Sequence, residues 1–415
     1  ISRFNSAFKK DSQKVIGSLR RILRESFIKI PETLPPMSSG LFGYLGYDMI
    51  RLVEKVPHGN FDRLMVPDSI LIRPSVITIV DGVRDEVTVV CPVWFNNFND
   101  YKEAAKMSKS LLSEVVKALS KPLRLKKHSM APFKDSSLLK SNTSKKDYQS
   151  LVEDAKNAIR SGEIFQIVLS QRWERDFTSS PISLYRSLRR TNPSPYMFFF
   201  KFKDFSIVGA SPEILVRVAN NQMTIRPIAG TRPRGGNQEE DAALASDLLD
   251  DDKENAEHLM LLDLGRNDVG KVSKVGTVRL TEQFIIEKYS HVMHIVSNVV
   301  GELKDNEDPI SALFSGLPAG TVSGAPKIRA MELIEKFEKE KRGIYGGGVG
   351  YFSSAGDMDI CIALRTGIIK EGKLFIQAGG GIVYDSCPEK EYEETVNKSK
   401  ALVVAAEEAY KYNYS

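Results

Sequence analysis

The chain has 415 residues, 42% hydrophobic and 27% charged, a balance that is ordinary for a globular protein and excludes a collagen-like, coiled-coil or mostly disordered chain. A formal net charge of +5 is too small at this length to indicate a nucleic-acid-binding protein. No apolar run approaches the roughly 18 residues that cross a bilayer, and the chain start lacks the apolar segment of a secretory signal.

The cysteines exclude two further classes of protein. Cys91, Cys361 and Cys387 are odd in number and far apart, so they give neither a disulfide framework nor the ligand spacing of a zinc site. Free cysteines are typical of a reducing compartment, and we expect a cytoplasmic protein. The sequence begins at Ile1 rather than Met, and we expect residues to be missing from its start.

The first third of the chain predicts a helix, a glycine-rich strand and a hairpin. Apolar residues recur at helical spacing over 11–29. Glycines alternate with aromatic residues in 39–52, which indicates a bent or closely packed strand. Two β-rich runs, 69–81 and 83–94, are joined by Asp81-Gly82, a typical hairpin turn.

A helix is expected over 99–118, and an unpatterned, Lys- and Ser-rich stretch follows over 121–146. This stretch lacks the interleaved aromatic residues of a nucleic-acid-binding arm, so we interpret it as a linker. The linker divides the chain into an N-terminal module over 1–120, truncated at its start, and a larger domain over 147–405.

Helices and strands are mixed in the remainder of the chain. Helical spacing of apolar residues predicts helices at 146–162, 181–192, 239–264, 327–338 and 389–411. Runs of β-branched and aromatic residues predict single strands at 164–175, 287–303, 346–352, 359–370 and 374–385, and strand pairs at 196–210 and 213–230. Many strands follow one another directly, which favours an α+β fold with mainly antiparallel sheets over a doubly wound parallel sheet.

Two pairs of glutamates lie three residues apart in helical segments: Glu254 with Glu257, and Glu391 with Glu394. Residues at this spacing share a helix face. Two such faces brought together would form an all-oxygen site for a hard cation such as Mg²⁺. A solvated acidic surface is the alternative, although Glu257 borders an apolar run.

His291 and His294 are also three residues apart, but their β-branched surroundings favour a strand. An odd offset on a strand places the two imidazoles on opposite faces, which disfavours a shared metal. One of them could face a cavity as a base near its ordinary pKa of about 6.5. A packed or surface histidine is the alternative.

Glycine-rich turns recur at 228–235, 318–327, 345–351 and 377–385. Backbone N–H groups in such turns can bind an anion, and ordinary tight turns are the alternative. The glycine and lysine spacing differs from a P-loop, so nucleotide binding is poorly supported.

Arg365 lies inside the apolar run 359–370 and needs a partner there, either a substrate carboxylate or an internal one. Together with the glutamates and the glycine-rich turns, it suggests an Mg²⁺-dependent site for a small molecule with more than one carboxylate.

Seven motifs in this order resemble the chorismate-utilising enzymes, and the anthranilate synthase component I family among them: PIAGTRPRG, EHLMLLDLGRND, KYSHVMH, AGTVSGAPK, YGGGVGYF, IALRTGI and AGGGIVYDS. The resemblance is dense over 147–405 and reaches back to 39–52. It implies a layered α/β/β/α body whose two mainly antiparallel sheets meet over the active site. It also implies a lyase that converts chorismate and ammonia to anthranilate and pyruvate in tryptophan biosynthesis.

The resemblance implies Mg²⁺ as the cofactor. Glu257 and Glu394 would ligate the metal directly, and Glu254 and Glu391 would hold its waters. The metal would in turn bind a carboxylate of chorismate.

The resemblance also implies the substrate contacts. Substrate carboxylates would be held by Gly230, Thr231, Gly379, Gly380 and Gly381. Tyr345 and Arg365 would bind the enolpyruvyl carboxylate, and Thr321 would line the ring. Gly380 stands where the family usually has alanine, and glycine keeps the backbone donors.

Three residues are implied in catalysis. Glu213 would protonate the departing C4 hydroxyl, because hydroxide is a poor leaving group. His294 would remove the C2 proton as pyruvate leaves. Siblings that add water have a lysine base where this chain has Gln166, and aminodeoxychorismate synthases have a lysine nucleophile where it has Ala229, so ammonia is the expected nucleophile at C2.

The ammonia would come from a partner, a glutamine amidotransferase subunit, because no cysteine here lies in a glutaminase nucleophile motif. The segment 192–199 matches the family's tryptophan-feedback segment, so inhibitor contacts are expected at Pro195, Tyr196 and Met197. The other half of that inhibitor site, a short N-terminal motif, is absent from the sequence.

Two alternatives remain at this point. An aminodeoxychorismate synthase would leave the pyruvyl group on its product. A non-catalytic amino-acid-binding regulatory subunit would keep the fold alone, but Glu213, Glu257, His294 and Glu394 are all intact, which argues against it.

Overall fold

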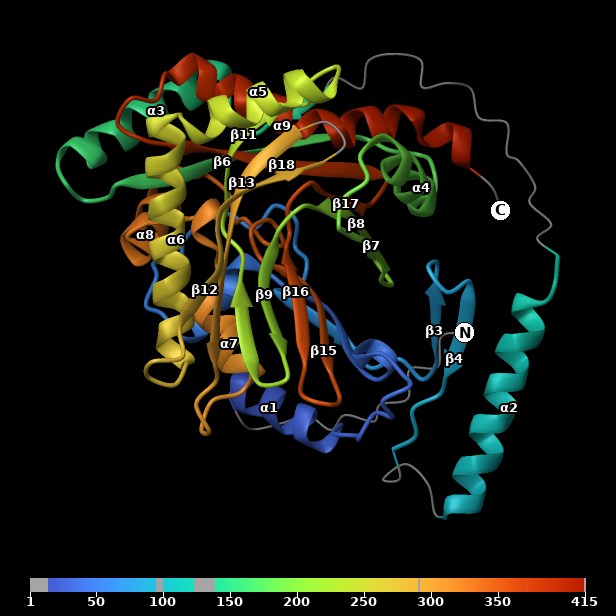
Figure 1. Cartoon of the computed structure of the whole chain (residues 1–415). Helices are drawn as coiled ribbons and strands as arrows, with labels where there is room; N and C mark the ends of the chain where they lie inside the picture. The colour runs from blue at the N-terminus through green and yellow to red at the C-terminus, as the bar shows by residue number, and fades with distance from the viewer. Residues whose placement is uncertain (1–13, 95–99, 123–138, 290–291, 414–415) are drawn as a thin grey trace.

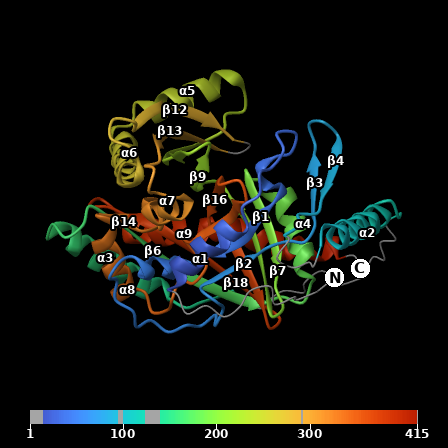
Figure 2. The ribbon, with the colours of Figure 1, turned by 90° about the horizontal axis from the view of Figure 1, so that it is seen from below.

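Two antiparallel sheets form the centre of the computed structural model, which describes residues 14–94, 100–122, 139–289 and 292–413 (Figures 1 and 2). The larger sheet has the strand order β11-β13-β10-β9-β16-β15-β1-β2, with β12 also paired to β13. Its strands are β1 (Gly40–Leu45), β2 (Ser69–Ile72), β9 (Ile214–Ala219), β10 (Gln222–Ile225), β11 (Ile228–Pro233), β12 (Arg279–Lys288), β13 (Val292–Glu302), β15 (Gly348–Ser353) and β16 (Met358–Ile362).

The smaller sheet has the order β14-β6-β18-β17-β8-β7, with β5 paired to β6. Its strands are β5 (Lys140–Ser141), β6 (Gln166–Asp176), β7 (Tyr196–Lys201), β8 (Phe205–Ser211), β14 (Gly324–Ala325), β17 (Thr366–Lys370) and β18 (Lys373–Ile382). The expected hairpin forms separately, from β3 (Ile77–Asp81) and β4 (Glu86–Val90).

Helices cover the outer faces of both sheets. The larger sheet packs against α6 (Asp252–Val272) and α7 (Pro309–Gly316), and the smaller one against α3 (Lys145–Arg160), α4 (Pro181–Thr191) and α9 (Pro388–Glu408). Buried side chains of both sheets, among them Tyr44, Ile207, Val349 and Ile368, form one apolar cluster between them. The predicted α+β fold with α/β/β/α layers is therefore confirmed.

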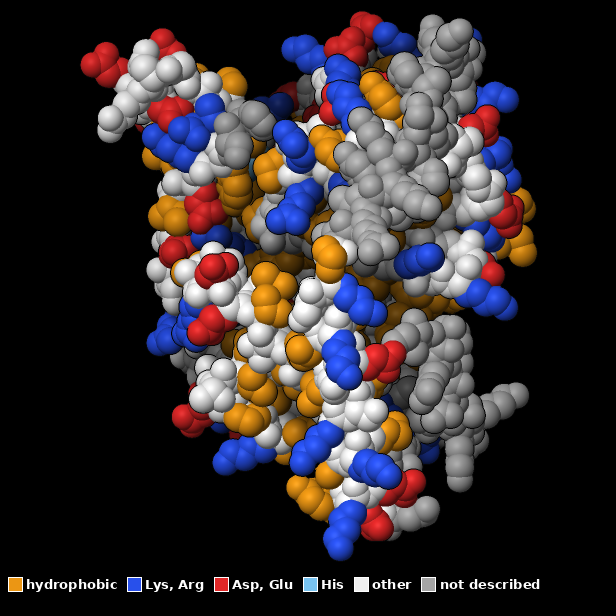
Figure 3. Space-filling model, turned by 90° about the vertical axis from the view of Figure 1, so that its right-hand side faces the viewer, with side chains coloured by type: hydrophobic (Ala, Val, Ile, Leu, Met, Phe, Trp, Pro, Cys, Tyr) orange, Lys and Arg blue, Asp and Glu red, His pale blue; other side chains and the backbone are white. Residues whose placement is uncertain are grey.

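The remaining helices lie around this body (Figure 2). They are α1 (Val15–Glu25), α2 (Tyr101–Leu119), α5 (Gln238–Leu249) and α8 (Lys327–Phe337), with short 3₁₀ helices η1 (Pro36–Ser38), η2 (Tyr47–Leu52), η4 (Gly320–Val322) and η5 (Ala409–Tyr412). None of the helices within the described ranges is both long and apolar enough to cross a membrane. Figure 3 shows the face near α2, where Lys and Arg side chains are scattered among acidic and apolar ones.

The glycine-rich strand is closely packed, as predicted. A Cβ atom on Gly43 would lie 1.9 Å from the carbonyl oxygen of Ile70, and one on Gly40 would lie 2.1 Å from that of Phe352. β1 pairs with β15 on one side and β2 on the other. Residues 40–72 therefore contribute strands to a sheet built mostly from the C-terminal part of the chain.

The domain division stays a prediction. Residues 123–138 of the expected linker lie outside the described residues, and its last part forms β5 and the start of α3. The run 69–81, expected as one strand, divides into β2 and β3.

The single helix predicted over 239–264 is wrong, because two helices, α5 and α6, occupy this region. The side chain of Asp251 accepts hydrogen bonds from the backbone N–H groups of Lys253 and Glu254 and caps the start of α6. Such a cap satisfies donors that have no partner within the helix, so it stabilises a new helix start at this position.

The single strand predicted over 359–370 is also wrong. It divides into β16, in the larger sheet, and β17, in the smaller one. Arg365 lies in the bend between them with φ +45°, in the left-handed region. The apolar run is therefore a crossing point between the two sheets.

Candidate active site

The candidate site lies where the chain passes from one sheet to the other. Glu213 follows β8 of the smaller sheet and precedes β9 of the larger one, and Arg365 lies at the matching passage from β16 to β17. Because β17 pairs with β8 and β16 pairs with β9, these two connections cross between the sheets side by side. The fold thus brings together an acidic side chain and a cationic one that are 152 positions apart in the numbering of the chain.

Glu213 has the environment of a proton donor. The Thr321 hydroxyl in η4 donates a hydrogen bond to Glu213 Oε2 over 3.1 Å. Burial raises the pKa of the Glu213 carboxyl, against the opposing effects of the Thr321 hydrogen bond and the charges of Lys398 and Arg365. A raised pKa keeps the proton on the carboxyl to higher pH, as a general acid requires.

His294, on β13, has the environment of a base. Its Nδ1 lies 2.9 Å from the backbone oxygen of Gly230 and 3.1 Å from the Thr231 hydroxyl oxygen. A carbonyl oxygen can only accept, so Nδ1 carries the proton and Nε2 keeps its lone pair. Burial lowers the pKa of His294, and the charge of Arg365 lowers it further, although the hydrogen bond to Gly230 opposes both.

His291, the other histidine of the motif, lies outside the described residues. Gly230 itself has φ +68°, which favours glycine at this turn in β11. The turn places the Gly230 carbonyl against His294 and the Gly230 Cα beside Glu254, whose Oε2 would lie 3.3 Å from an added Cβ.

Two cationic side chains surround Glu213. Arg365 is half-buried, and its Nη1 donates to the side-chain oxygen of Asn192 over 3.4 Å. An ion-paired carboxylate, the alternative that the sequence left open, is not found for Arg365 within the described part of the chain. Burial lowers the pKa of Arg365, and the negative charge of Glu213 opposes this shift. A bound carboxylate would compensate the charge of Arg365 fully.

Lys398, on α9, is the second cation and was missed in the sequence. Its Nζ donates to Glu394 Oε1 over 2.7 Å and to the Gly379 carbonyl over 3.1 Å. Its charge interacts electrostatically with both Tyr345 and Glu213. The sequence signal was a glutamate and a lysine four residues apart, which on most helices forms a simple surface pair.

The glycines of β18 leave one side of the strand unpaired among the described residues, and Lys398 contacts the strand at the Gly379 carbonyl. Gly379, Gly380 and Gly381 pair with β6 on one side, whereas β17 pairs only with Lys373–Ile376 on the other. The Tyr345 hydroxyl oxygen would lie 2.9 Å from a Cβ on Gly379, so the phenol lies directly over the face of the sheet at this glycine. Burial raises the pKa of Tyr345, which keeps the hydroxyl protonated as a donor.

Gln166, at the start of β6, is buried, and its Nε2 would lie 3.0 Å from a Cβ on Gly381. Its Nε2 donates to Glu257 Oε1 over 3.1 Å, and its Oε1 is buried without a hydrogen-bond partner. The amide therefore has one fixed orientation and one unused acceptor.

The four predicted metal-binding glutamates lie on the first two turns of two helices, Glu254 and Glu257 on α6 and Glu391 and Glu394 on α9. Like charge on the neighbouring glutamate adds to burial in raising the pKa of Glu254 and of Glu391. Glu391 Oε2 is buried without a hydrogen-bond partner and would lie 3.3 Å from a Cβ on Gly380. Both pairs therefore border the site, but among the described residues no three acidic, histidine or cysteine side chains converge closely enough to hold a metal.

The expected feedback residues lie at the start of β7. The Tyr196 hydroxyl donates to Asp359 Oδ1 over 3.0 Å, and Met197 packs against the apolar cluster under α4 and α9. Pro195 is exposed. Asn192, the partner of Arg365, precedes this segment, so the segment adjoins the site.

Comparison with known proteins bears directly on this arrangement. The profile of the chorismate binding enzyme family matches residues 3–404. Anthranilate synthase component 1 of Cereibacter sphaeroides is 57% identical over 98% of this chain and 82% of its own length. The same component of Pseudomonas putida is 49% identical over 89% of this chain and 75% of its own length.

Solved structures agree with the sequence relatives. Anthranilate synthase component I of Streptococcus pneumoniae has a TM-score of 0.80 at 40% identity, over 92% of this chain and 84% of that one. The menaquinone-specific isochorismate synthase of Escherichia coli has a TM-score of 0.73 at 22% identity, over 94% of this chain and 82% of that one, and shows the shared fold alone. The chain belongs to the chorismate binding enzymes and, among them, to the anthranilate synthase component 1 family.

Proposed function

We propose that this chain converts chorismate and ammonia to anthranilate and pyruvate, the step that commits chorismate to tryptophan. The observation that carries the proposal is the arrangement around Glu213. A carboxyl with a raised pKa lies beside two cations, Arg365 and Lys398, and the charge of Arg365 also reaches a histidine whose pKa is lowered. The cations suit a substrate with two carboxylates, and the acid and base suit an elimination.

The acid and the base act in two successive steps. As ammonia adds at C2, Glu213 gives its proton to the C4 hydroxyl, which leaves as water. His294 Nε2 then takes the proton from C2, and the electron pair of that bond completes the aromatic ring as the C3–O bond breaks. The departing enolpyruvate takes up a proton and becomes pyruvate. The pKa of Glu213 is raised and that of His294 is lowered. Both shifts enlarge the fraction of enzyme molecules in which Glu213 is protonated and His294 is neutral.

Gln166 supports ammonia rather than water as the nucleophile. A neutral amide cannot deprotonate water, whereas ammonia attacks without losing a proton first. The unused Oε1 of Gln166 is an acceptor suited to an N–H group. Fixed by Glu257, it supports a role in orienting the nucleophile.

The residues present fit Mg²⁺. Glu257 and Glu394 would ligate the ion, and Glu254 and Glu391 would hold its waters, an all-oxygen set of the kind Mg²⁺ prefers. The unpartnered Glu391 Oε2 and the like-charge pairs are what a divalent cation would relieve. When bound, the ion would offset the charge of a substrate carboxylate.

We expect Glu257→Gln to remove the effect of Mg²⁺ alone on thermal unfolding. Magnesium at about a hundredfold excess over its dissociation constant should stabilise the unsubstituted protein by about 2.7 kcal/mol. Glu393→Gln is the matched control, since Glu393 is exposed on the same helix as Glu394. An equal thermal shift in Glu257→Gln and the control would contradict the metal assignment.

We further propose that a separate glutamine amidotransferase subunit supplies the ammonia, that the pair works in the cytoplasm, and that tryptophan contacts the Pro195–Met197 segment. The purified chain is tested with chorismate, Mg²⁺ and either ammonium or glutamine. We expect chorismate to be consumed with ammonium and not with glutamine. Equal consumption with glutamine would contradict the need for a partner, and no consumption with either would contradict the proposed activity.

A further inference from the structure

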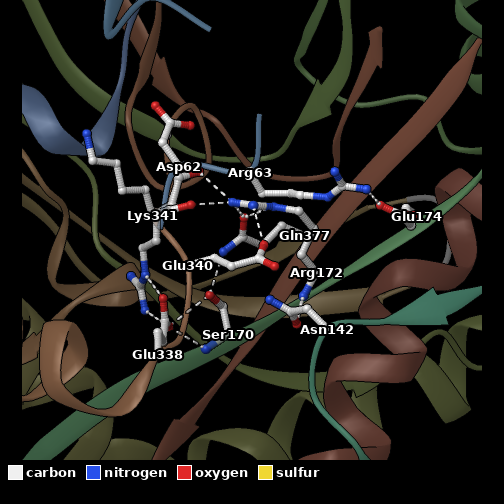
Figure 4. Close-up of polar contacts among 12 residues, drawn as sticks. Asp62, Arg63, Asn142, Ser170, Arg172, Glu174, Glu338, Glu340, Lys341 and Gln377 are labelled. Carbon is white, nitrogen blue, oxygen red and sulfur yellow. Dashed lines mark hydrogen bonds and ion pairs between the residues drawn. The ribbon is translucent and has the colours of Figure 1, made fainter. Parts of the chain in front are cut away.

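Figure 4 shows a network of polar side chains in which Ser170, Arg172, Glu338 and Gln377 are buried. Glu338, which follows α8, accepts hydrogen bonds from the backbone N–H of Ser170 over 2.8 Å and from its hydroxyl over 2.9 Å. Gln377 donates to the same hydroxyl over 2.8 Å and accepts from Arg172 Nε over 3.0 Å. These bonds tie the segment after α8 to both β6 and β18.

Arg342 completes this network at the end nearest to Tyr345. Its Nε donates to Glu338 Oε2 over 2.9 Å, and its Nη2 donates to Glu338 Oε1 over 2.5 Å. The two side chains are 2% and 5% exposed, so the ion pair is removed from water. A buried ion pair is weak evidence for stability, because desolvation offsets most of the attraction. Its contacts therefore point to another role.

The contacts of Arg342 reach three elements that carry substrate residues. Nη1 donates to the carbonyl of Val322 over 2.5 Å, next to Thr321 in η4. Nη2 donates over 2.6 Å to the carbonyl of Val168, which pairs with Gly381 across the sheet. The guanidinium carbon lies 5.7 Å from the ring centre of Tyr345, within the range of a cation–π contact.

We propose that Arg342, oriented by Glu338, is a positioning residue that fixes the Tyr345 phenol for the substrate carboxylate. Because Arg342 is buried, we expect it to act through Tyr345 and not by contact with the substrate. Its planar group holds η4, β6 and the Tyr345 ring in one relative placement, and an ammonium group could not make these four bonds at once. This inference rests on the proposed function, because it assumes that Tyr345 contacts chorismate.

The test is the Arg342→Lys variant, assayed with chorismate and ammonium. A misplaced contact of this kind costs binding, so KM for chorismate should rise about tenfold while kcat changes less than about threefold. Arg51→Lys is the matched control. Arg51 is also largely buried, with bonds to Asp48, Glu335 and the Pro57 carbonyl, but none of these lies in the site.

A double-mutant cycle with Tyr345→Phe separates positioning from a general structural role. If Arg342 acts through the Tyr345 hydroxyl, Arg342→Lys should change KM less than about twofold in the Tyr345→Phe background. A tenfold effect in both backgrounds, or a lower kcat at unchanged KM, would overturn the proposal.

Ser170→Ala keeps the test decisive should Arg342→Lys fail to fold, because it removes one bond to Glu338 and leaves the charges paired. We expect a smaller rise in KM that again disappears with Tyr345→Phe, and an unchanged KM would overturn the proposal. An unsubstituted chain that does not bind chorismate would defeat the proposed function instead.

Discussion

Replacing His294 with alanine should lower anthranilate formation by about 10²- to 10⁴-fold, the usual contribution of a general base. The aminated intermediate, still carrying its pyruvyl group, should accumulate, because His294 acts only after ammonia has added. The reason is the Nδ1 contact with Gly230, which leaves Nε2 as the one nitrogen able to accept the C2 proton. Chromatography with mass detection would separate intermediate from product.

His58→Ala is the control for loss of a histidine, since His58 is exposed and far along the chain from β13. It should leave the product and its rate unchanged. Full-rate anthranilate formation by His294→Ala, with no intermediate, would remove the base assignment.

Replacing Glu213 with glutamine should stop the reaction one step earlier, again with a loss of about 10²- to 10⁴-fold. An amide has no proton of suitable acidity for the C4 hydroxyl, so neither anthranilate nor the aminated intermediate should form. Binding of chorismate should persist, because glutamine keeps the hydrogen bond with Thr321. Chorismate binding and product formation, measured on one preparation, check both expectations.

The pH dependence of the activity tests the role of Glu213 as the acid. Glu213 must be protonated, so activity should fall as pH rises through its pKa. The Thr321 hydrogen bond lowers that pKa by stabilising the carboxylate. Thr321→Val should therefore raise the pKa of Glu213 and move the alkaline fall to higher pH. A fall that moves to lower pH would contradict the role of Glu213.

The local elements follow from the sequence wherever the pattern is regular. The helix and strand periodicities predict the positions of most elements. Together with the ordered motifs, they predict the layered antiparallel fold. The failures have specific physical causes. The single helix predicted over 239–264 divides at Asp251, because the side chain of Asp251 caps the backbone N–H groups at the start of a second helix. Arg365 looked like a strand residue because its neighbours on both sides are apolar, although they belong to two different sheets.

The sequence predicts most of the residues of the candidate site, but little of how they are arranged in space. Glu213 and Arg365 meet because two strand connections cross side by side, which no local pattern reveals. In the sequence, Lys398 and Glu394 resemble an ordinary ion pair on a helix surface. Only the fold shows that the charge of Lys398 interacts with Tyr345 and Glu213. The glutamate pairs were found from spacing, whereas the placement of Glu391 beside Gly380 and of Glu254 beside Gly230 depends on long-range packing.

The proposed reaction is tested most directly by measuring anthranilate fluorescence and pyruvate release together, from chorismate, Mg²⁺ and ammonium at alkaline pH. We expect the two products to appear together in a one-to-one ratio, since one elimination produces both. An aminated product that retains its pyruvyl group, formed without pyruvate, would contradict the proposed reaction and indicate an aminodeoxychorismate synthase.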